Sequence, residues 1–246
     1  MTIIPRSSLP DPRNSNIAVI GLGYVGLPLA VQFAKSKICC KSKNECKRVI
    51  YGFDINPTRI QQLNAGIDIT KEVESNTLID LENLQLTVNS SELINADIFI
   101  VTVPTPIDNV NRPNLEPLIS ASRTVGLILR ERLNVGIKTE PIVIYESTVY
   151  PGATEEVCIP EIEIASGLSL HNDFHCGYSP ERINPGDKVH DIRSIVKVVS
   201  ASSKHVAEIV LLKPENFLRN KLERHFGWYL SPNSRHIHPD LNRVDY

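Results

Sequence analysis

The sequence predicts an α/β protein whose main domain is a doubly wound parallel sheet. Short apolar runs of strand length alternate with longer stretches in which apolar residues recur every three or four positions. A glycine-rich turn directly follows the first of these runs, where a helix should begin. Several later runs end in polar, proline-containing loops. Strands that alternate with helices in this way form βαβ units, and their sheet is covered on both faces.

Six apolar runs are predicted strands, and one further run is a candidate. They are Ile17–Ile20, Val49–Phe53, Leu86–Val88, Ile98–Val103, Ile142–Tyr145 and Phe174–Tyr178, with Ile195–Val199 as the candidate. One helix is expected to begin at Gly26. A second is expected from Asn114, a candidate N-cap, to about Leu133. A third is expected to start at Pro151-Gly152. Beyond Ile209 the alternation stops, which predicts a divergent and poorly ordered C-terminal tail.

Composition argues against several classes of function. The 246 residues are 41% hydrophobic and 22% charged, with a formal net charge of −2, so we expect neither a nucleic-acid nor a membrane partner. The first twelve residues contain no apolar core of a signal peptide, and the apolar runs are too short to span a bilayer. We therefore expect a cytoplasmic protein.

The cysteines fit that compartment. An odd count of five, scattered along the chain, does not form a disulfide framework. Cys39, Cys40 and Cys46 cluster in a basic extension at about 36–47, and His236 and His238 lie close together. Neither group has a second pair at ligand spacing, so we interpret both as loop residues and predict no metal site.

The glycine turn is typical of a dinucleotide site. Gly21, Gly23 and Gly26 would respectively allow the tight turn, the approach of a diphosphate and close helix–strand packing. Asp54 ends the second strand, where its carboxylate would bind the adenosine ribose and disfavour a 2′-phosphate, which indicates NAD. The alternative for Asp54 is an N-cap of the next helix. Gly21 and Asp54 lie 33 residues apart rather than the usual twenty or so, and the basic extension accounts for the excess.

Three further loops should open at the same edge of the sheet. Thr102 and Thr105 lie at the carboxyl end of the fourth strand, and their hydroxyls could meet the ribose or diphosphate, or the segment could simply end the strand. "YESTVYPG" and "YSPERINPGD" follow the next two strands. Glu181 in the last of these is either a carboxylate held near the cofactor to activate water or a turn residue.

Five motifs, in order, resemble the UDP-glucose/GDP-mannose dehydrogenase family over about residues 16–209: "GLGYVGLPLA", "GFDIN", "VTVPTP", "YESTVYPG" and "SPERINPGD". The last motif is similar to the branch that oxidises UDP-N-acetylhexosamines, with N-acetylglucosamine and N-acetylgalactosamine both open. The resemblance implies a Rossmann-like domain, NAD as cofactor and homodimers. It also implies a four-electron oxidation of the sugar C6 alcohol to a carboxylate through a cysteine thioester, for polysaccharide biosynthesis.

The resemblance also implies roles for individual residues. Thr148 would position cofactor and water, and Glu181 would act as general base in hydrolysis. Arg182 and Asn184 would lie near the sugar phosphate, beside Glu181 in the substrate site. The residues expected to hold NAD are Gly21, Gly23, Tyr24, Val25, Gly26, Asp54, Arg59, Thr105 and Thr148.

The sequence departs from the family in its second half. The Gly-Gly-x-Cys-Ile loop of the nucleophile, the central helix and the UDP-sugar domain have no counterpart in it. We expect an arm (1–15), an NAD-binding domain (16–200) and, over 201–246, the start of a connecting helix with an unrelated tail. Such a truncated form would bind NAD and be inactive alone. The alternatives are a non-catalytic NAD-binding module that acts with a partner chain, or another oxidoreductase on the same fold.

Overall fold

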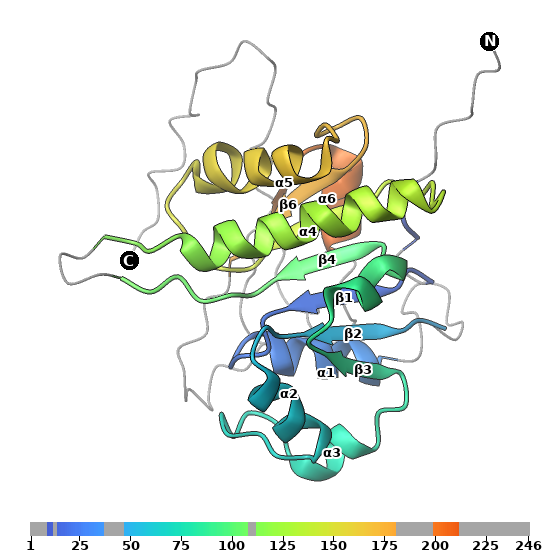
Figure 1. Ribbon diagram of the computed structural model, residues 1–246, viewed down its shortest axis with the longest axis vertical. Helices are drawn as coiled ribbons and strands as arrows, with labels where there is room; N and C mark the ends of the chain where they lie inside the picture. Colours follow the sequence, from blue (N-terminus) through green and yellow to red (C-terminus); the bar gives the residue numbers. More distant parts are fainter. Residues whose placement is uncertain (1–8, 12–13, 37–46, 108–111, 181–198, 212–246) are drawn as a thin grey trace.

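The computed structural model of the chain describes residues 9–11, 14–36, 47–107, 112–180 and 199–211. Within these ranges a seven-stranded sheet has the order β3-β2-β1-β4-β5-β6-β7 (Figure 1). Strands β1 to β6 run parallel, and β7 pairs antiparallel with β6. The order reverses between β1 and β4, which confirms the doubly wound sheet. The strands are β1 (Ile17–Ile20), β2 (Ile50–Phe53), β3 (Leu84–Thr87), β4 (Ile98–Val101), β5 (Ile142–Tyr145), β6 (His175–Tyr178) and β7 (Ser200–Ala201).

Strand boundaries differ from the prediction mainly at the edges. Strand β3 begins at Leu84, because its register follows β2 from Ile50 onward, and the predicted Val88 lies outside it. Strand β4 ends at Val101 rather than Val103. Of the candidate strand at 195–199, only Val199 lies among the described residues, and it precedes β7.

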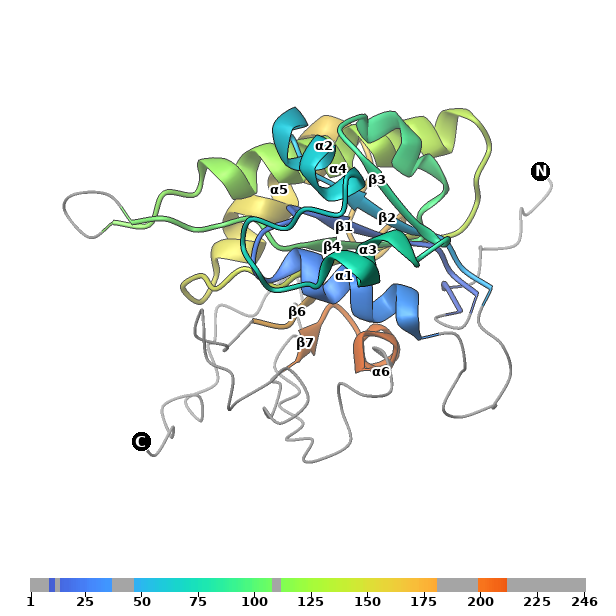
Figure 2. The ribbon, with the colours of Figure 1, turned by 90° about the horizontal axis from the view of Figure 1, so that it is seen from below.

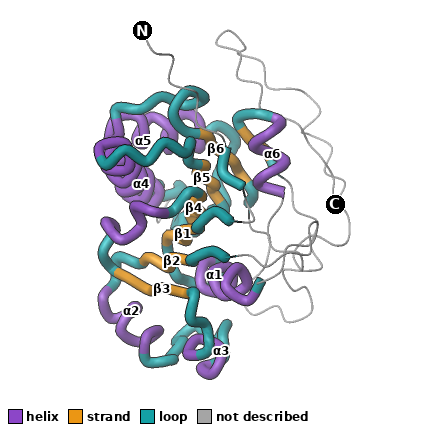
Figure 3. Tube along the Cα trace, turned by 90° about the vertical axis from the view of Figure 1, so that its right-hand side faces the viewer, coloured by secondary structure: helices purple, strands orange, loops and turns teal. Residues whose placement is uncertain are grey.

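Helices cover both faces of the sheet (Figures 2 and 3). Helices α4 and α5 lie together on one face, α1 and α6 lie on the other, and α2 and α3 lie beyond β3. Within the described ranges, every helix is too short or too polar to span a lipid bilayer. The helices are α1 (Gly26–Lys35), α2 (Pro57–Asn64), α3 (Ser75–Ile79), the 3₁₀ helix η1 (Ser90–Asn95), α4 (Glu116–Asn134), the π-helical turn η2 (Thr154–Cys158), α5 (Ile159–Ser166) and α6 (Lys204–Leu211).

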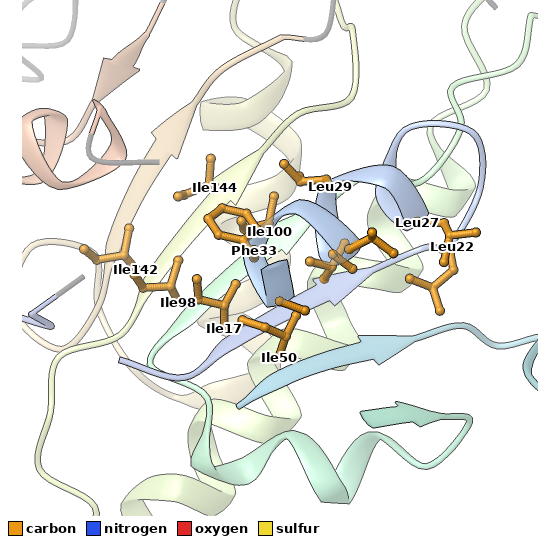
Figure 4. Packing of buried hydrophobic residues seen from close by; sticks show 14 of the residues in the cluster. Ile17, Leu22, Leu27, Leu29, Phe33, Ile50, Ile98, Ile100, Ile142 and Ile144 are labelled. Atoms are coloured by element: carbon orange, nitrogen blue, oxygen red, sulfur yellow. The ribbon is translucent and has the colours of Figure 1, made fainter. Parts of the chain in front are cut away.

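The sheet separates two apolar cores. Every residue of β1, β2, β4 and β5 is buried, as expected for central strands of a parallel sheet covered on both faces. Alternate strand residues point to opposite faces, so Ile17 and Ile98 pack under α1 with Phe33 (Figure 4). On the other face Phe99 belongs to the core formed with α4 and α5. The strands whose carboxyl ends carry the polar loops are therefore anchored between two packed cores.

Two helix starts differ from the prediction. Leu115, not Asn114, occupies the N-cap position of α4, although the Asn114 Oδ1 accepts a hydrogen bond from the Glu116 N–H at 2.9 Å. The helix expected at Pro151 begins at Thr154 with a π-helical turn, in which the Ile159 N–H bonds the Thr154 carbonyl. Pro160, with no N–H of its own, follows directly, which fits the widened turn.

Candidate functional site

A pocket of about 920 Å³ lies at the carboxyl edge of the sheet. Loops that follow β1, β2, β4 and β5 line it, and so do parts of α2 and α4. The expectation that the polar loops meet at one edge is therefore confirmed for these four strands. This is also the point where the strand order reverses, which is where doubly wound sheets bind ligands. The strand ends and the loops after them contribute residues 20–25, 53–56, 102–105 and 146–148.

The three glycines of the first loop have different reasons to be glycine. Gly21 has a φ of +92°, a conformation that side chains disfavour. A Cβ on Gly26 would lie 1.9 Å from the Gly21 carbonyl oxygen, so the helix could not approach the turn. Within the described part of the chain a Cβ on Gly23 would meet nothing within 4 Å, yet Gly23 lines the pocket. The backbone conformation thus requires a glycine at position 21, and close packing requires one at position 26. At position 23 the missing side chain keeps space free in the pocket.

The N-terminus of α1 is suited to an anion. The Leu27 N–H makes the first backbone bond of this turn, to the Gly23 carbonyl at 3.1 Å. No side chain of the described residues caps the helix, and no acidic residue lies in its first turn. The positive end of the helix dipole therefore faces the glycine loop without a counter-charge from its own first turn. Tyr24 and Val25 line the pocket here, and the Tyr24 side chain is about half exposed.

Asp54 is tied to the glycine loop. Its Oδ2 accepts a hydrogen bond from the Leu22 N–H at 2.9 Å, and its Oδ1 accepts one from the Asn56 N–H at 2.9 Å. The alternative in which Asp54 caps α2 is wrong, because Asn56 occupies the N-cap and accepts from the Thr58 and Arg59 N–H groups. Asn56 also lines the pocket. Asp54 thus presents its carboxylate at the pocket end of β2.

Arg59 lies under the same loop. Its side chain is 7% exposed and pairs with Asp68 at 2.8 Å, and its Nε donates to the Leu22 carbonyl at 2.9 Å. Arg59 lines the pocket, and its Nη1 is buried without a hydrogen-bond partner among the described residues. A buried guanidinium of this kind suits an oxygen-rich ligand.

The threonines after β4 serve the loops themselves. The Thr102 hydroxyl lies 2.7 Å from the Gly21 carbonyl oxygen and 3.0 Å from that of Ile20. It therefore donates its hydrogen bond to the backbone of the glycine turn. The Thr105 hydroxyl donates to the Thr148 carbonyl at 2.9 Å. Ser147, whose hydroxyl donates to the Val103 carbonyl at 2.5 Å, makes a second link between these loops. The loops after β4 and β5 are therefore joined, and Thr105 and Thr148 both line the pocket.

Three predicted substrate residues, Glu181, Arg182 and Asn184, lie outside the described residues. The preceding segment follows β6 at the same edge, where the Ser179 N–H donates to the Tyr145 carbonyl at 2.9 Å.

The cysteines in the described part of the chain are buried thiols. Burial raises the pKa of Cys158 to about 11 and that of Cys176 well above its usual value. Both thiols stay protonated near neutral pH, which makes them poor nucleophiles. Cys39, Cys40 and Cys46 lie outside the described residues. Among the side chains that are described, no three His, Cys, Asp or Glu residues gather into a possible metal site.

Sequence reasoning missed several residues that line the pocket. Asn56-Pro57 is a recognisable helix start, so Asn56 could have been found as the cap. Ile69 and Thr70 come from the loop after α2, and Ser120 and Thr124 come from α4. Their positions depend on how distant segments pack, and no local motif marks them.

Comparison with known proteins points to one group. The sequence model described as the UDP-glucose/GDP-mannose dehydrogenase family, NAD binding domain, matches residues 15–212. A UDP-N-acetyl-D-glucosamine 6-dehydrogenase from Pseudomonas aeruginosa is 50% identical over 198 residues, which are 80% of this chain and 42% of the relative. One from Salmonella typhi is 46% identical over 79% of this chain and 41% of the relative. The chain thus spans less than half the length of these relatives.

The fold comparison agrees. The structure of a UDP-N-acetyl-D-mannosamine dehydrogenase from Pyrococcus horikoshii aligns with a TM-score of 0.68 and 28% identity. The alignment covers 86% of this chain and 47% of that one.

Proposed function

The chain belongs to the UDP-glucose/GDP-mannose dehydrogenase family, and from this premise we propose that its pocket holds NAD for the oxidation of a UDP-N-acetylhexosamine at C6. The matched region is the family's NAD-binding domain, and NAD is the cofactor. Identities of 50% and 46% to UDP-N-acetyl-D-glucosamine 6-dehydrogenases favour N-acetylglucosamine as the sugar.

The observation that carries the proposal is the pairing of the glycine loop with Asp54 at one pocket. The open space at Gly23 and the uncapped start of α1 suit a diphosphate. The Asp54 carboxylate, at the end of the neighbouring strand, suits a ribose diol and repels a 2′-phosphate. The residues present therefore fit NAD.

We assign the binding roles as follows. The backbone of Gly21, Gly23, Tyr24, Val25 and Gly26 would hold the diphosphate, and Asp54 would hold the adenosine ribose. Arg59 would offer its Nη1, which has no hydrogen-bond partner in the described ranges, to an oxygen of the dinucleotide. The loops after β4 and β5 are linked by the hydrogen bond from Thr105 to Thr148. These two threonines would contact the cofactor from the side of the pocket opposite Asp54.

When bound, NAD accepts the hydrides that leave the sugar carbon. Glu181 would take a proton from the water that hydrolyses the acyl intermediate, and Thr148 would orient that water. Arg182 and Asn184 would bind the sugar phosphate. The buried state of Cys158 and Cys176 argues against either as the thiol that captures the aldehyde. We propose that in the relatives this thiol comes from the part that has no match here, and that this chain acts in the cytoplasm.

The test is a titration of the 246-residue chain with NAD and with NADP, followed by the addition of UDP-N-acetyl-D-glucosamine. We expect NAD to bind more tightly than NADP, and no rise in absorbance at the NADH wavelength from this chain alone. Failure to bind NAD would refute the proposal. Stoichiometric formation of uronic acid would refute the claim that the chain alone is inactive.

A further inference from the structure

Asp68 organises the loop between α2 and α3 from within. Its side chain is 1% exposed. Oδ1 accepts from the Thr70 hydroxyl at 2.7 Å and the Thr70 N–H at 3.0 Å. Oδ2 accepts from the N–H groups of Glu72 at 2.9 Å and Val73 at 3.0 Å. Residues 67–73, here called the Asp68 loop, therefore wrap around one carboxylate, and Lys71 takes a left-handed φ of 58° to do so.

The same carboxylate reaches the glycine loop through one side chain. Arg59 pairs with Asp68 through Nη2 at 2.8 Å and donates from Nε to the Leu22 carbonyl at 2.9 Å. The N–H of Leu22 in turn donates to Asp54 at 2.9 Å. The peptide groups of Leu22 are thus held on one side by Asp54 and on the other by the Arg59–Asp68 pair.

One donor of this arrangement remains unused. Arg59 Nη1 is buried and has no hydrogen-bond partner among the described residues, although Arg59 lines the pocket. Buried polar groups are almost always paired, so a donor left over beside a pocket indicates an acceptor on a ligand. Ile69 and Thr70 of the Asp68 loop line the same pocket.

We propose that Asp68 is a positioning residue of the dinucleotide site, which sets the affinity for the adenosine diphosphate half through Arg59 without touching the ligand. The proposal rests on the proposed function. The ion pair fixes Arg59 so that Nε holds the glycine loop and Nη1 stays available, and the wrapped loop forms the adjoining wall.

The charge state of Asp68 supports this role. Burial alone would raise the pKa of its carboxyl group, but the hydrogen bonds from Thr70, Arg59 and Val73 outweigh burial and lower the pKa. The carboxylate is therefore charged at neutral pH and can keep its ion pair.

The experiment compares Asp68→Asn, Arg59→Met, their double variant and Asp173→Asn by calorimetric titration with NAD and with ADP-ribose. Asp173 is a matched control, because its Oδ2 also accepts a loop N–H, that of Ser169 at 2.8 Å, in the loop that precedes β6. We expect Asp68→Asn to raise the dissociation constants of both ligands by roughly tenfold or more, which is the effect of losing one hydrogen bond to a charged group. Asp173→Asn should leave both dissociation constants unchanged.

The double variant separates positioning from a general loss of stability. If Asp68 acts through Arg59, then Asp68→Asn should weaken binding little further once Arg59 is Met. Additive losses would overturn the proposal, and so would an Asp68→Asn variant that binds like the wild type. Wild-type chain that binds neither ligand would overturn the proposed function as well.

A measurement on the wild type covers the case in which Asp68→Asn does not fold. Saturating ADP-ribose should slow hydrogen exchange at the Thr70, Glu72 and Val73 amides, which bond Asp68, together with the Leu22 amide. Unchanged exchange in the Asp68 loop, with protection at Leu22 alone, would overturn the proposal.

Discussion

The Asp54 carboxylate accepts a hydrogen bond from the Leu22 N–H at 2.9 Å and so joins the end of β2 to the glycine loop after β1. A second bond, from the Asn56 N–H at 2.9 Å, fixes the other oxygen. The carboxylate is thus oriented before any ligand arrives. A group held in this way loses little conformational freedom when it binds a ribose, which favours affinity.

Gly23→Ala should separate binding from folding. A Cβ at Gly23 meets no atom of the described residues within 4 Å, so the free energy of unfolding should change by less than about 1 kcal/mol. The methyl group would occupy the space assigned to the diphosphate, so the affinity for NAD should fall at least about tenfold. Calorimetric titration and urea unfolding measure the two effects.

Gly26→Ala is the matched comparison. Its Cβ would lie 1.9 Å from a backbone oxygen, so this variant should lose about 1–3 kcal/mol of stability or more. Unchanged NAD affinity in a folded Gly23→Ala variant would argue against the assigned position of the diphosphate.

Thr102 should act on the turn through its hydroxyl. Thr102→Val would leave the Gly21 carbonyl without its side-chain donor, and we expect a loss of about 1–3 kcal/mol in the free energy of unfolding. Thr102→Ser keeps the hydroxyl and should recover most of that loss. Chemical denaturation of both variants provides the measurement, and equal stability of the Val variant and the wild type would contradict it.

Arg132 should stabilise the opposite edge of the sheet without affecting NAD. Its buried guanidinium donates to the carbonyls of Ile94 and Ala96, and pairs with Asp97 at 3.2 Å. Arg132→Met would leave that carboxylate without its cation, at a cost of about 3–5 kcal/mol. Thermal and urea unfolding measure the loss, and calorimetry should give an unchanged dissociation constant for NAD in the folded variant.

Arg123→Met is the control for Arg132. Arg123 also pairs with a carboxylate, that of Glu161 at 2.6 Å, but its side chain is 59% exposed, so little stability should be lost. If the two variants lost similar amounts of unfolding free energy, burial of the Arg132–Asp97 pair would not explain its contribution to stability.

Cys158 should make stability fall at high pH. Burial disfavours the thiolate and raises the pKa of Cys158 in the folded protein from the ordinary thiol value of 9.0 to about 11. The folded state therefore keeps a proton that the unfolded state loses. The contribution is fully present below about pH 9 and is lost as the pH rises toward 11, by up to about 3 kcal/mol.

Cys158→Ala should show a shallower decline of the unfolding free energy over that range. Urea titrations at pH 8, about 9.5 and about 10.5 would measure the slopes of wild type and variant. Parallel slopes would contradict the prediction.

Much of the fold and part of the site could be predicted from local patterns. Gly21, Gly23 and Asp54 lie beside buried strands whose ends share an edge, so a strand–turn–helix pattern sufficed to place them together. Asn56 directly precedes Pro57, a residue favoured at the start of a helix, so the sequence could have identified Asn56 rather than Asp54 as the cap. The partner of Asp54 could not be found in this way, because its carboxylate accepts from Leu22, a residue 32 positions away.

Asp68 is the clearest case that local patterns do not reveal. Its Asp-x-Thr turn is a common loop pattern, and its link to the pocket depends on Arg59, a tertiary contact. The roles of Glu181, Arg182 and Asn184 stay predictions, since these residues lie outside the described ranges.

The most direct test of the central claim is calorimetric titration of the wild type and of Asp54→Ala with NAD and with NADP. The account predicts that the wild type binds NAD with a dissociation constant between about 1 µM and 1 mM, and NADP more weakly. Asp54→Ala should lower the affinity for NAD at least about tenfold, and it should reduce the difference in affinity between NAD and NADP. No heat with millimolar NAD on folded wild type, or an Asp54→Ala variant with the same affinity as the wild type, would contradict it.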